Sequence, residues 1–251
     1  MVDETEMIFH ILQGEPSTAH GDLSRMREAP MQSLKKINAP QNLTALAYNS
    51  IKSYILREDL DEETRLTEEF LSNQLGISKS PVREALNSLH TQGLIRIEAR
   101  RGAYLRRFTA QEVKDLYDLR EALEVYAVGA AVVTPELLSE LRESTKRTRK
   151  FLKANDRIGH IEEDTKFHGL IAVAAGNAEL CHVLANLQSQ ILLCRRKTYD
   201  LSASTSPSAH RAILEALENG NRKEAQSAMH SHIALVRQRL LDFMKEKNES
   251  T

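Results

Sequence analysis

The sequence predicts a mainly α-helical chain in two parts: three helices with a small β-hairpin, then an all-α bundle of about six helices. Three observations predict this fold class. Apolar residues recur at helical spacing along most of the chain. Two short strand-like stretches lie between residues 94 and 107, and no strand pattern follows them. Glycine, proline and helix-capping residues separate the helical stretches.

The chain divides into three regions. Residues 1–40 form an N-terminal extension that we expect to be largely disordered, with at most one docking helix. Residues 41–108 form the first domain and residues 109–247 the helical domain. The first helix should span residues 43–57, because its apolar residues follow one helical face: Leu43, Leu46, Ala47, Ile51 and Ile55.

Two further helices of the first domain meet at a tight turn. Thr67 can cap the first of them, and Gly76 ends it because glycine adopts the left-handed conformation without strain. Ser78 can cap the next helix, and Pro81 falls in its first turn. The residues predicted to point inward from the two helices are Phe70, Leu71, Leu75, Val82, Ala85, Leu86 and Leu89.

A hairpin follows the second of these helices. Residues 94–98 read as a strand, residues 99–102 as a turn and residues 103–107 as the returning strand. Two helices joined by a tight turn and then a hairpin form a winged helix-turn-helix, which places one helix in the major groove of DNA. Arg100 and Arg101 lie at the hairpin tip beside Gly102, and arginine at such a tip can enter a minor groove.

Charge supports DNA binding locally. Residues 77–107 contain seven basic and two acidic residues, a net charge of +5, whereas the whole chain carries −1. Lys79, Ser80, Arg83 and Asn87 fall off the apolar face, so they can reach phosphates and base edges. The alternative is a charged, solvated surface without a partner. The agreement of turn, caps, proline and basic tip favours a DNA-binding surface.

Helix boundaries recur after residue 108. Thr109 and Glu112 form a capping box, and Thr134 with Pro135 opens a second helix. A third helix spans about 157–175 and a fourth about 177–199, followed by a loop at 202–206. A fifth helix starts at 206–207 and ends at 219–220. The sixth runs from a cap at 221 to about 245.

Four residues of the bundle can form a metal site. Asp164 and His168 are four residues apart, so they leave one helix face together, and His210 and His232 lie on two other predicted helices. One carboxylate and three imidazoles suit a divalent transition metal such as Zn²⁺, Mn²⁺, Fe²⁺ or Ni²⁺. The alternative for an Asp-x-x-x-His pair is a surface hydrogen bond or an ion pair within the helix.

The first domain closely resembles the DNA-binding domain of GntR-family bacterial transcription regulators. The resemblance is carried by residues 75–86 (LGISKSPVREAL), 93–95 (GLI) and 101–102 (RG). It implies that Ser78, Lys79, Ser80 and Arg83 contact DNA and that Gly102 enters the minor groove. The family usually has arginine at the position of Lys79, and many members have a DNA-contacting arginine at the position of Glu69. Base preference can therefore differ here.

The helical domain is similar to the FCD ligand-sensing domain of the FadR subfamily. Its motifs are residues 118–124, 164–168, 175–177, 210–214 and 228–232, and the count of six helices favours the VanR-like branch. The resemblance implies that Asp164, His168, His210 and His232 coordinate the metal. His230 and His232 lie about 200° apart around a helix, so only one faces the site, and the Met-x-x-His pattern selects His232.

The resemblance also implies a ligand. In that subfamily the metal often helps to hold the carboxylate of a small organic acid, which a nearby arginine can clamp bidentately. Arg120, Arg195 and Arg196 are the candidates, and the alternative for Arg120 is an ordinary salt bridge with Glu124.

Composition limits the class of protein. Apolar content of 41% and charged content of 27% are typical of a soluble globular protein. No apolar run reaches the ~18 residues of a membrane helix, and no secretory signal is evident. Cys181 and Cys194 would lie ~20 Å apart on one helix, so we expect no mutual disulfide. These features predict a cytoplasmic protein.

The leading hypothesis is a metabolite-responsive transcription regulator, not an enzyme. As a homodimer it would bind an inverted-repeat operator on double-stranded DNA, and an acidic metabolite at the metal would modulate that binding, most often by releasing repression. One alternative is a metal-dependent hydrolase or lyase that carries a DNA-binding module, although no motif supplies a general base. Another is a bundle that serves only for dimerisation and has an empty pocket.

Overall fold

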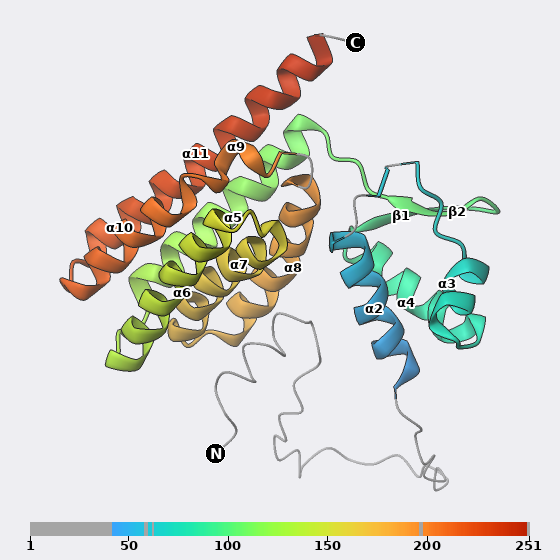
Figure 1. The fold of residues 1–251 in the computed structure, drawn as a ribbon, viewed down its shortest axis with the longest axis horizontal. Helices are drawn as coiled ribbons and strands as arrows, with labels where there is room; N and C mark the ends of the chain where they lie inside the picture. Colours follow the sequence, from blue (N-terminus) through green and yellow to red (C-terminus); the bar gives the residue numbers. More distant parts are fainter. Residues whose placement is uncertain (1–41, 58–59, 62, 196–197, 250–251) are drawn as a thin grey trace, which may run out of the picture.

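The computed structural model describes residues 42–57, 60–61, 63–195 and 198–249. Predictions for residues 1–41 therefore lie outside the described residues. Figure 1 shows a smaller unit, which contains a hairpin, beside a larger helical bundle. The smaller unit contains α2 (Leu43–Arg57), α3 (Glu68–Leu75), α4 (Lys79–Thr91), β1 (Ile95–Glu98) and β2 (Gly102–Leu105). The bundle contains α5 (Ala110–Ala130), α6 (Pro135–Lys153), α7 (Arg157–Ala174), α8 (Ala178–Arg195), α9 (Asp200–Ala203), α10 (Ser206–Glu218) and α11 (Arg222–Glu249).

The turn between α3 and α4 forms as predicted. The side chain of Thr67 accepts a hydrogen bond from the backbone N–H of Phe70 at 3.1 Å, which satisfies one free amide of the first helical turn. Gly76 ends α3 with φ +66°, in the left-handed region. Ser78 stands at the N-terminus of α4 in an extended conformation, but its side chain makes no capping hydrogen bond. Its hydroxyl is exposed beside the first turn of α4.

The core of this unit includes most of the predicted residues. Val82, Ala85, Leu86 and Leu89 are buried along α4, and Ala47, Ile51 and Ile55 along α2. Three predicted inward positions are wrong: Leu43 is 41% exposed, Leu46 52% and Phe70 43%. Tyr48 takes a buried place on α2 and donates a hydrogen bond to Gln92. Leu43 and Leu46 lie outside the stripe of α2 that is buried, which runs through Ala47, Tyr48, Ile51 and Ile55. Phe70 lies on the exposed side of α3.

The hairpin is antiparallel and slightly shorter than predicted. Ile95 pairs with Leu105 and Glu98 with Gly102, so a three-residue turn, 99–101, joins the strands. Arg100 has φ +65° and Gly102 has φ +116°. A methyl group at Gly102 would meet the backbone oxygen of Leu66 at 3.3 Å, so glycine allows the close approach of the hairpin to residues 65–66.

The bundle has the six long helices of the prediction and one short helix more. The capping box of Thr109 and Glu112 forms, and Thr134 caps α6. The prediction of a loop at 202–206 is wrong at residues 202 and 203, which belong to α9 (Asp200–Ala203), whereas residues 204–205 form a turn and α10 starts at Ser206 as predicted. Serine-rich composition favours a loop, but Ser202 and Ala203 are buried here, and packing decides. Both cysteines lie on α8 as free thiols.

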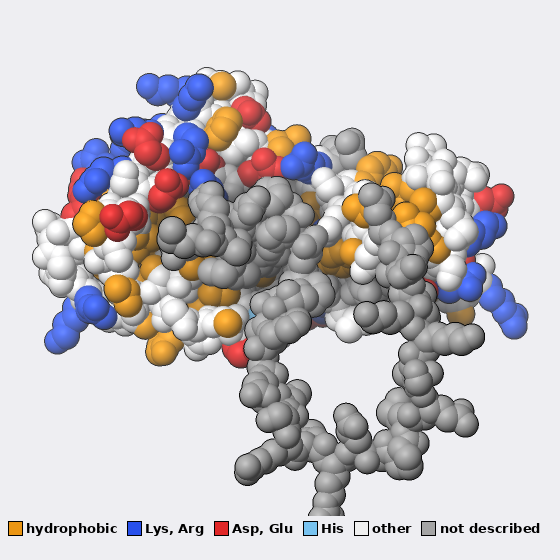
Figure 2. Space-filling view, turned by 90° about the horizontal axis from the view of Figure 1, so that it is seen from below, with side chains coloured by type: hydrophobic (Ala, Val, Ile, Leu, Met, Phe, Trp, Pro, Cys, Tyr) orange, Lys and Arg blue, Asp and Glu red, His pale blue; other side chains and the backbone are white. Residues whose placement is uncertain are grey.

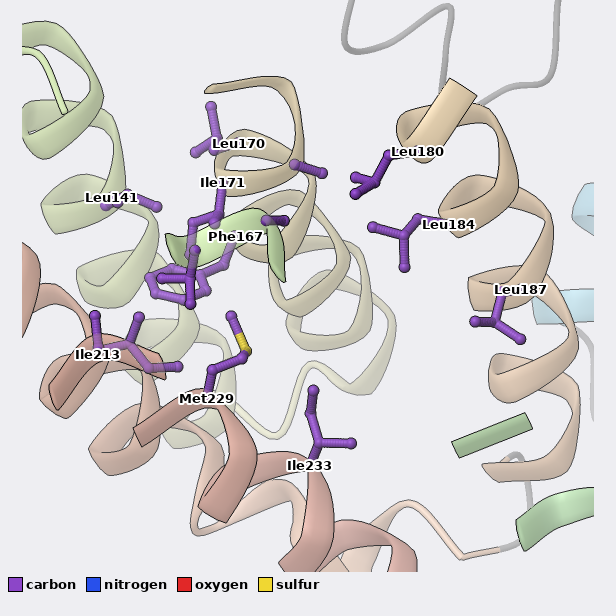
Figure 3. Packing of buried hydrophobic residues seen from close by; sticks show 14 of the residues in the cluster. Leu141, Phe167, Leu170, Ile171, Leu180, Leu184, Leu187, Ile213, Met229 and Ile233 are labelled. Atoms are coloured by element: carbon purple, nitrogen blue, oxygen red, sulfur yellow. The ribbon is translucent and has the colours of Figure 1, made fainter. Parts of the chain in front are cut away.

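Apolar side chains from α6, α7, α10 and α11 meet in the bundle core. Figure 3 shows Leu141, Phe167, Ile213 and Met229 pointing toward one another. The ring of Phe167 also stacks on the imidazole of His210, with centroids 4.0 Å apart and planes 2° apart. The apolar core therefore fixes the position of a polar residue that the sequence assigns to the metal site.

Helix α8 faces the smaller unit (Figure 1) and contacts it directly. Gln190 donates a hydrogen bond of 2.9 Å to the backbone oxygen of Gln92, at the C-terminal end of α4. Leu193 packs into the core of the smaller unit. Across the same junction, Arg57 and Glu162 form an exposed ion pair. In the described part of the chain, none of the helices has the length and apolarity needed to cross a membrane.

The difference in burial between Leu89 and Leu46 predicts how their substitution changes the stability of the smaller unit. Leu89→Ala removes a side chain that is 0% exposed, so we expect the free energy of unfolding to fall by about 2–5 kcal/mol. Leu46→Ala is the matched control, because Leu46 is largely exposed and its loss should change stability by less than about 1 kcal/mol. Urea unfolding of the two variants measures both. Equal losses would contradict the assigned core.

Candidate metal centre and DNA-binding face

Four predicted ligands converge inside the bundle. Asp164 and His168 come from α7, His210 from α10 and His232 from α11. All four are buried, and one ligand atom of each lies within 4.8 Å of those of the others. Two atoms on opposite sides of an ion bound at about 2.1 Å are about 4.2 Å apart. The cluster is therefore close to the size that a transition metal requires.

Several imidazole nitrogens of the cluster lack a hydrogen-bond partner among the described residues: Nε2 of His168 and both ring nitrogens of His210. The His210 ring lies beside Asp164, with Nε2 3.4 Å from Oδ1. Buried polar atoms are normally satisfied, and a bound cation would satisfy Nε2 of His168 and one of the two ring nitrogens of His210. The donor set and the unsatisfied atoms therefore fit a divalent transition metal.

The protonation states also fit a metal site. Burial opposes ionisation of Asp164, but His210 and Arg195 outweigh it and hold the pKa of this carboxyl well below its usual range. Burial lowers the pKa of His210 to about 3 and that of His232 well below its ordinary value. Asp164 is thus ionised and these two imidazoles are neutral at neutral pH, the states in which they can bind a metal.

A second layer of polar residues holds the ligands in place. Ser206 donates a hydrogen bond of 2.6 Å to Oδ1 of Asp164. Nδ1 of His168 faces the carboxylate of Glu124, which accepts a hydrogen bond of 2.7 Å from Nε of Arg120. A carboxylate on one imidazole nitrogen leaves the other nitrogen available to a metal. Burial opposes the charge of Glu124, yet Arg120 and His168 lower its pKa to about 2.

A small cavity adjoins the cluster on the side of α8. Its lining residues are Arg120, Asp164, Thr165, His168, Gln188, Ile191, Leu192 and Arg195. Arg195 approaches Asp164 to 3.6 Å and donates a hydrogen bond of 3.1 Å to Ser202. Arg120, although it lines the cavity, forms the buried pair with Glu124 that the sequence offered as the alternative to ligand binding. Arg196 lies outside the described residues.

Three further histidines of the bundle lie outside the cluster. His230 is exposed and lies 2.8 Å from Glu121, so the choice of His232 over His230 agrees with the placement of the two side chains. His160 is buried, packs edge-on against the ring of Tyr199, and has no hydrogen-bond partner among the described residues. His182 is exposed.

The predicted DNA-contacting residues gather at the start of α4. Ser78, Lys79, Ser80 and Arg83 are all exposed. Arg83 forms a two-point ion pair with Glu68 of α3, with both N–O distances 2.7 Å. Figure 2 shows Lys and Arg side chains projecting at the end of the molecule where Figure 1 places α3 and the hairpin. This exposed surface with basic side chains lies at the N-terminal end of α4, the part of a helix that can contact bases and phosphates in a helix-turn-helix.

The hairpin tip presents further positive charge. The side chain of Arg101 is 78% exposed, and its nearest acid, Glu98, lies 3.7 Å away. Arg101 and Gly102 thus lie together at the tip, where the sequence placed them.

Comparison with known proteins identifies both parts of the chain. Residues 43–105 match the family described as bacterial regulatory proteins, gntR family, and residues 115–235 match the FCD domain. The chain belongs to the GntR family of transcription regulators. The subfamily that the sequence resembles is consistent with this pair of domains.

Named relatives of this GntR regulator support the same assignment. The chain is 27% identical over 220 residues to the HTH-type transcriptional regulator YdhC of Bacillus subtilis, covering 86% of the chain and 98% of the relative. It is 30% identical over 135 residues to an HTH-type transcriptional regulator of Agrobacterium vitis, covering 51% of this chain and 79% of the relative. The solved structure of Escherichia coli McbR/YncC shares the fold, with TM-score 0.71, 21% identity, and 82% of this chain and 98% of that chain covered. Families and relatives are regulators, not enzymes.

Sequence reasoning missed three residues that contact predicted site residues. Glu124 was considered only as a partner for Arg120, although its carboxylate also contacts His168, because α5 packs against α7. Ser206 was read as a helix start and not as a partner of Asp164. Glu68 was not assigned a role, because its pairing with Arg83 depends on how α3 and α4 cross.

The metal assignment makes a testable prediction. His232→Ala should reduce the metal content of the purified protein to a small fraction of that of the wild type, because it removes one of four converging ligands. His168→Ala in addition should abolish it. His230→Ala is the matched control, two residues away and exposed, and should retain full content. Elemental analysis after dialysis measures the outcome, and full metal in the His232 variant would show that the ligand set is wrong.

Proposed function

We propose that this GntR regulator is a homodimeric repressor that binds a divalent transition metal through Asp164, His168, His210 and His232, and that a small carboxylic acid bound at this metal changes its affinity for DNA. The observation that carries the proposal is the convergence of four buried ligands beside a cavity that Arg195 lines. A location in the cytoplasm, where operator DNA and metabolites meet, is part of the same proposal.

The charge of the site favours an anionic ligand. Glu124 and Arg120 neutralise each other, and so do Asp164 and Arg195. A divalent ion would then leave the cavity with a net charge of +2, and a carboxylate would offset it. As a Lewis acid, the bound metal supplies an acceptor site for a carboxylate oxygen.

A polar atom at the cavity can determine which acid binds. Oε1 of Gln188, a lining residue, has no hydrogen-bond partner among the described residues. It can accept a hydrogen bond from a ligand hydroxyl. A hydroxy acid would use this group best.

Helix α8 provides the physical link between ligand and DNA. Gln188, Ile191 and Arg195 of α8 line the cavity, while Gln190 and Leu193 of the same helix contact the DNA-binding unit. A ligand that displaces α8 at the cavity therefore also displaces the C-terminal end of α4, the helix that carries the predicted DNA-contacting residues. This link is effective only if the ligand binds the two arrangements of α8 with different affinity.

The enzyme alternative is not favoured. Among the described lining residues of the cavity, Asp164 is the only carboxylate, and it belongs to the proposed ligand set. The nearby Glu124 is paired with Arg120, and its lowered pKa makes it a poor base. Incubation of purified protein and metal with a panel of hydroxy acids and dicarboxylic acids should give saturable binding without product.

The test of the proposal is DNA affinity under four conditions. Full-length protein would first select a duplex from a random library. Its affinity for that duplex would then be measured with and without Zn²⁺ and with and without the acid panel. An acid that lowers affinity only when metal is present supports the proposal. Affinity that no acid changes in either state would refute it.

A second prediction concerns the recognition helix. Arg83→Ala should weaken binding to the selected duplex by at least about tenfold at fixed salt, because it removes a contact to a base or a phosphate. Arg142→Ala, an arginine of α6 paired with Glu218, is the control and should bind normally. Raising salt from about 50 to about 200 mM should lower wild-type affinity by orders of magnitude if several phosphates are contacted. A flat salt response in a gel-shift assay would argue against the basic face.

A third prediction concerns the link through α8. Gln190→Ala removes the hydrogen bond to the end of α4, so the acid should bind as in the wild type but change DNA affinity less. Isothermal titration measures the first quantity and fluorescence anisotropy the second. Gln238→Ala, on the surface of α11, is the control. An unchanged ligand effect on DNA affinity in the Gln190 variant would remove this contact from the coupling.

A further inference from the structure

We infer that Glu68 is a specificity-determining residue that orients Arg83 so that Arg83 reads a guanine in the operator. The inference rests on the proposed role of Arg83 at the DNA surface and adds to it a base and a positioning residue. It starts from the ion pair between α3 and α4, which joins the two helices on the face that presents Lys79 and Ser80.

The geometry of the pair is two-pronged. Nε of Arg83 donates to Oε1 of Glu68, and Nη2 donates to Oε2, each at 2.7 Å. Two parallel hydrogen bonds fix the plane of the guanidinium group as well as its position. The carboxylate is ready for this role, because the hydrogen bond from Arg83 holds the pKa of Glu68 below its usual value.

The pair leaves one edge of the guanidinium group free. Arg83 has five N–H donors, and Glu68 occupies Nε–H and one N–H of Nη2. The opposite edge keeps one N–H on each of Nη1 and Nη2, directed away from Glu68. Two parallel donors match the N7 and O6 acceptors of guanine in the major groove. The side chain of Arg83 is 62% exposed, so this edge can be reached.

Stability of the fold does not account for the pair. Exposed ion pairs contribute little to stability, and both partners are exposed to solvent, Glu68 at 32%. An acidic side chain beside phosphates also weakens DNA binding by simple repulsion. In this inference Glu68 favours DNA binding through Arg83. A side chain that is already held in one orientation loses less conformational freedom when it binds.

Neighbouring acids differ from Glu68 in this respect. Glu69 is exposed on the next position of α3, and no contact to Arg83 is found for it. Glu84 of α4 instead accepts a hydrogen bond of 2.8 Å from Thr44. Glu69→Gln thus removes the same charge from the same helix end without releasing Arg83, and it is the matched control for Glu68→Gln.

The experiment uses full-length protein and the duplex that it selects from a random library. Each guanine of one half-site is replaced in turn by 7-deazaguanine, which lacks the N7 acceptor. For the wild type, one replacement should weaken binding by up to roughly 150-fold, the upper limit for a complete two-point contact to guanine, because the analogue keeps the O6 acceptor. In Glu68→Gln and Glu68→Ala, the penalty at that guanine should fall by at least about threefold, while affinity for random duplex stays equal or rises.

The controls separate orientation from charge and from folding. Glu69→Gln should keep the full penalty at the same guanine. Arg83→Lys should lose the penalty because lysine has no two-point edge, and adding Glu68→Gln to it should change nothing more. Thermal unfolding checks that each variant is folded.

Three outcomes would overturn the inference. The first is a penalty that Glu68→Gln leaves intact. The second is a wild type that shows no penalty at any guanine, which would assign Arg83 to phosphate. The third is an equal loss of penalty in Glu69→Gln, which would make the effect one of charge. Failure of the proposed function would look different, because no acid would then change the affinity of the wild type for the selected duplex, whereas the penalty at the guanine would remain.

Discussion

The bundle depends on a cluster of polar side chains in its centre, where water cannot solvate them. An ionised carboxylate and three imidazoles are buried there, and an isolated buried charge costs several kcal/mol unless partners compensate it. Asp164 is compensated by Ser206 and Arg195, and Glu124 by Arg120. The unsatisfied imidazole nitrogens remain uncompensated in the absence of a cation. A bound metal would therefore contribute to the stability of the bundle as well as to ligand binding.

This constraint extends into the apolar packing. The ring of Phe167 belongs to the bundle core and stacks on His210, so a movement of the ligand set has to move core residues as well. Closely packed interiors shift between discrete arrangements and do not deform continuously. Helix α8 borders both the cavity and the DNA-binding unit, so a discrete shift at the ligand site can reach α4 through Gln190. Helix α8 therefore connects the surroundings of the four-residue cluster with the DNA-binding unit.

Local signals in the sequence predicted the helix boundaries well because caps act within a few residues. Thr67, Thr109 and Thr134 each accept the hydrogen bond that their position predicts. The predicted metal ligands also come together, because helical spacing fixes which face Asp164 and His168 share. Side-chain burial was harder to predict. Leu46 and Phe70 have the right spacing for the core but are largely exposed, because the width of a contact between helices is not encoded in the local pattern of either helix.

Contacts between helices mark the limit of what sequence reasoning could reach, and the two functional surfaces illustrate it in opposite ways. In the bundle, burial of a charged side chain carries a large desolvation penalty, so a buried charged group needs a partner of opposite charge. Such partners can be partly inferred from chemistry. At the DNA-binding face, water solvates exposed charges, so Glu68 needs no partner for the protein to fold. Its pairing with Arg83 follows from the crossing of α3 and α4, which the turn at Gly76 sets. An exposed pair of this kind adds little to folding but leaves a fixed donor edge facing outward, and that edge is where recognition of a base can be built.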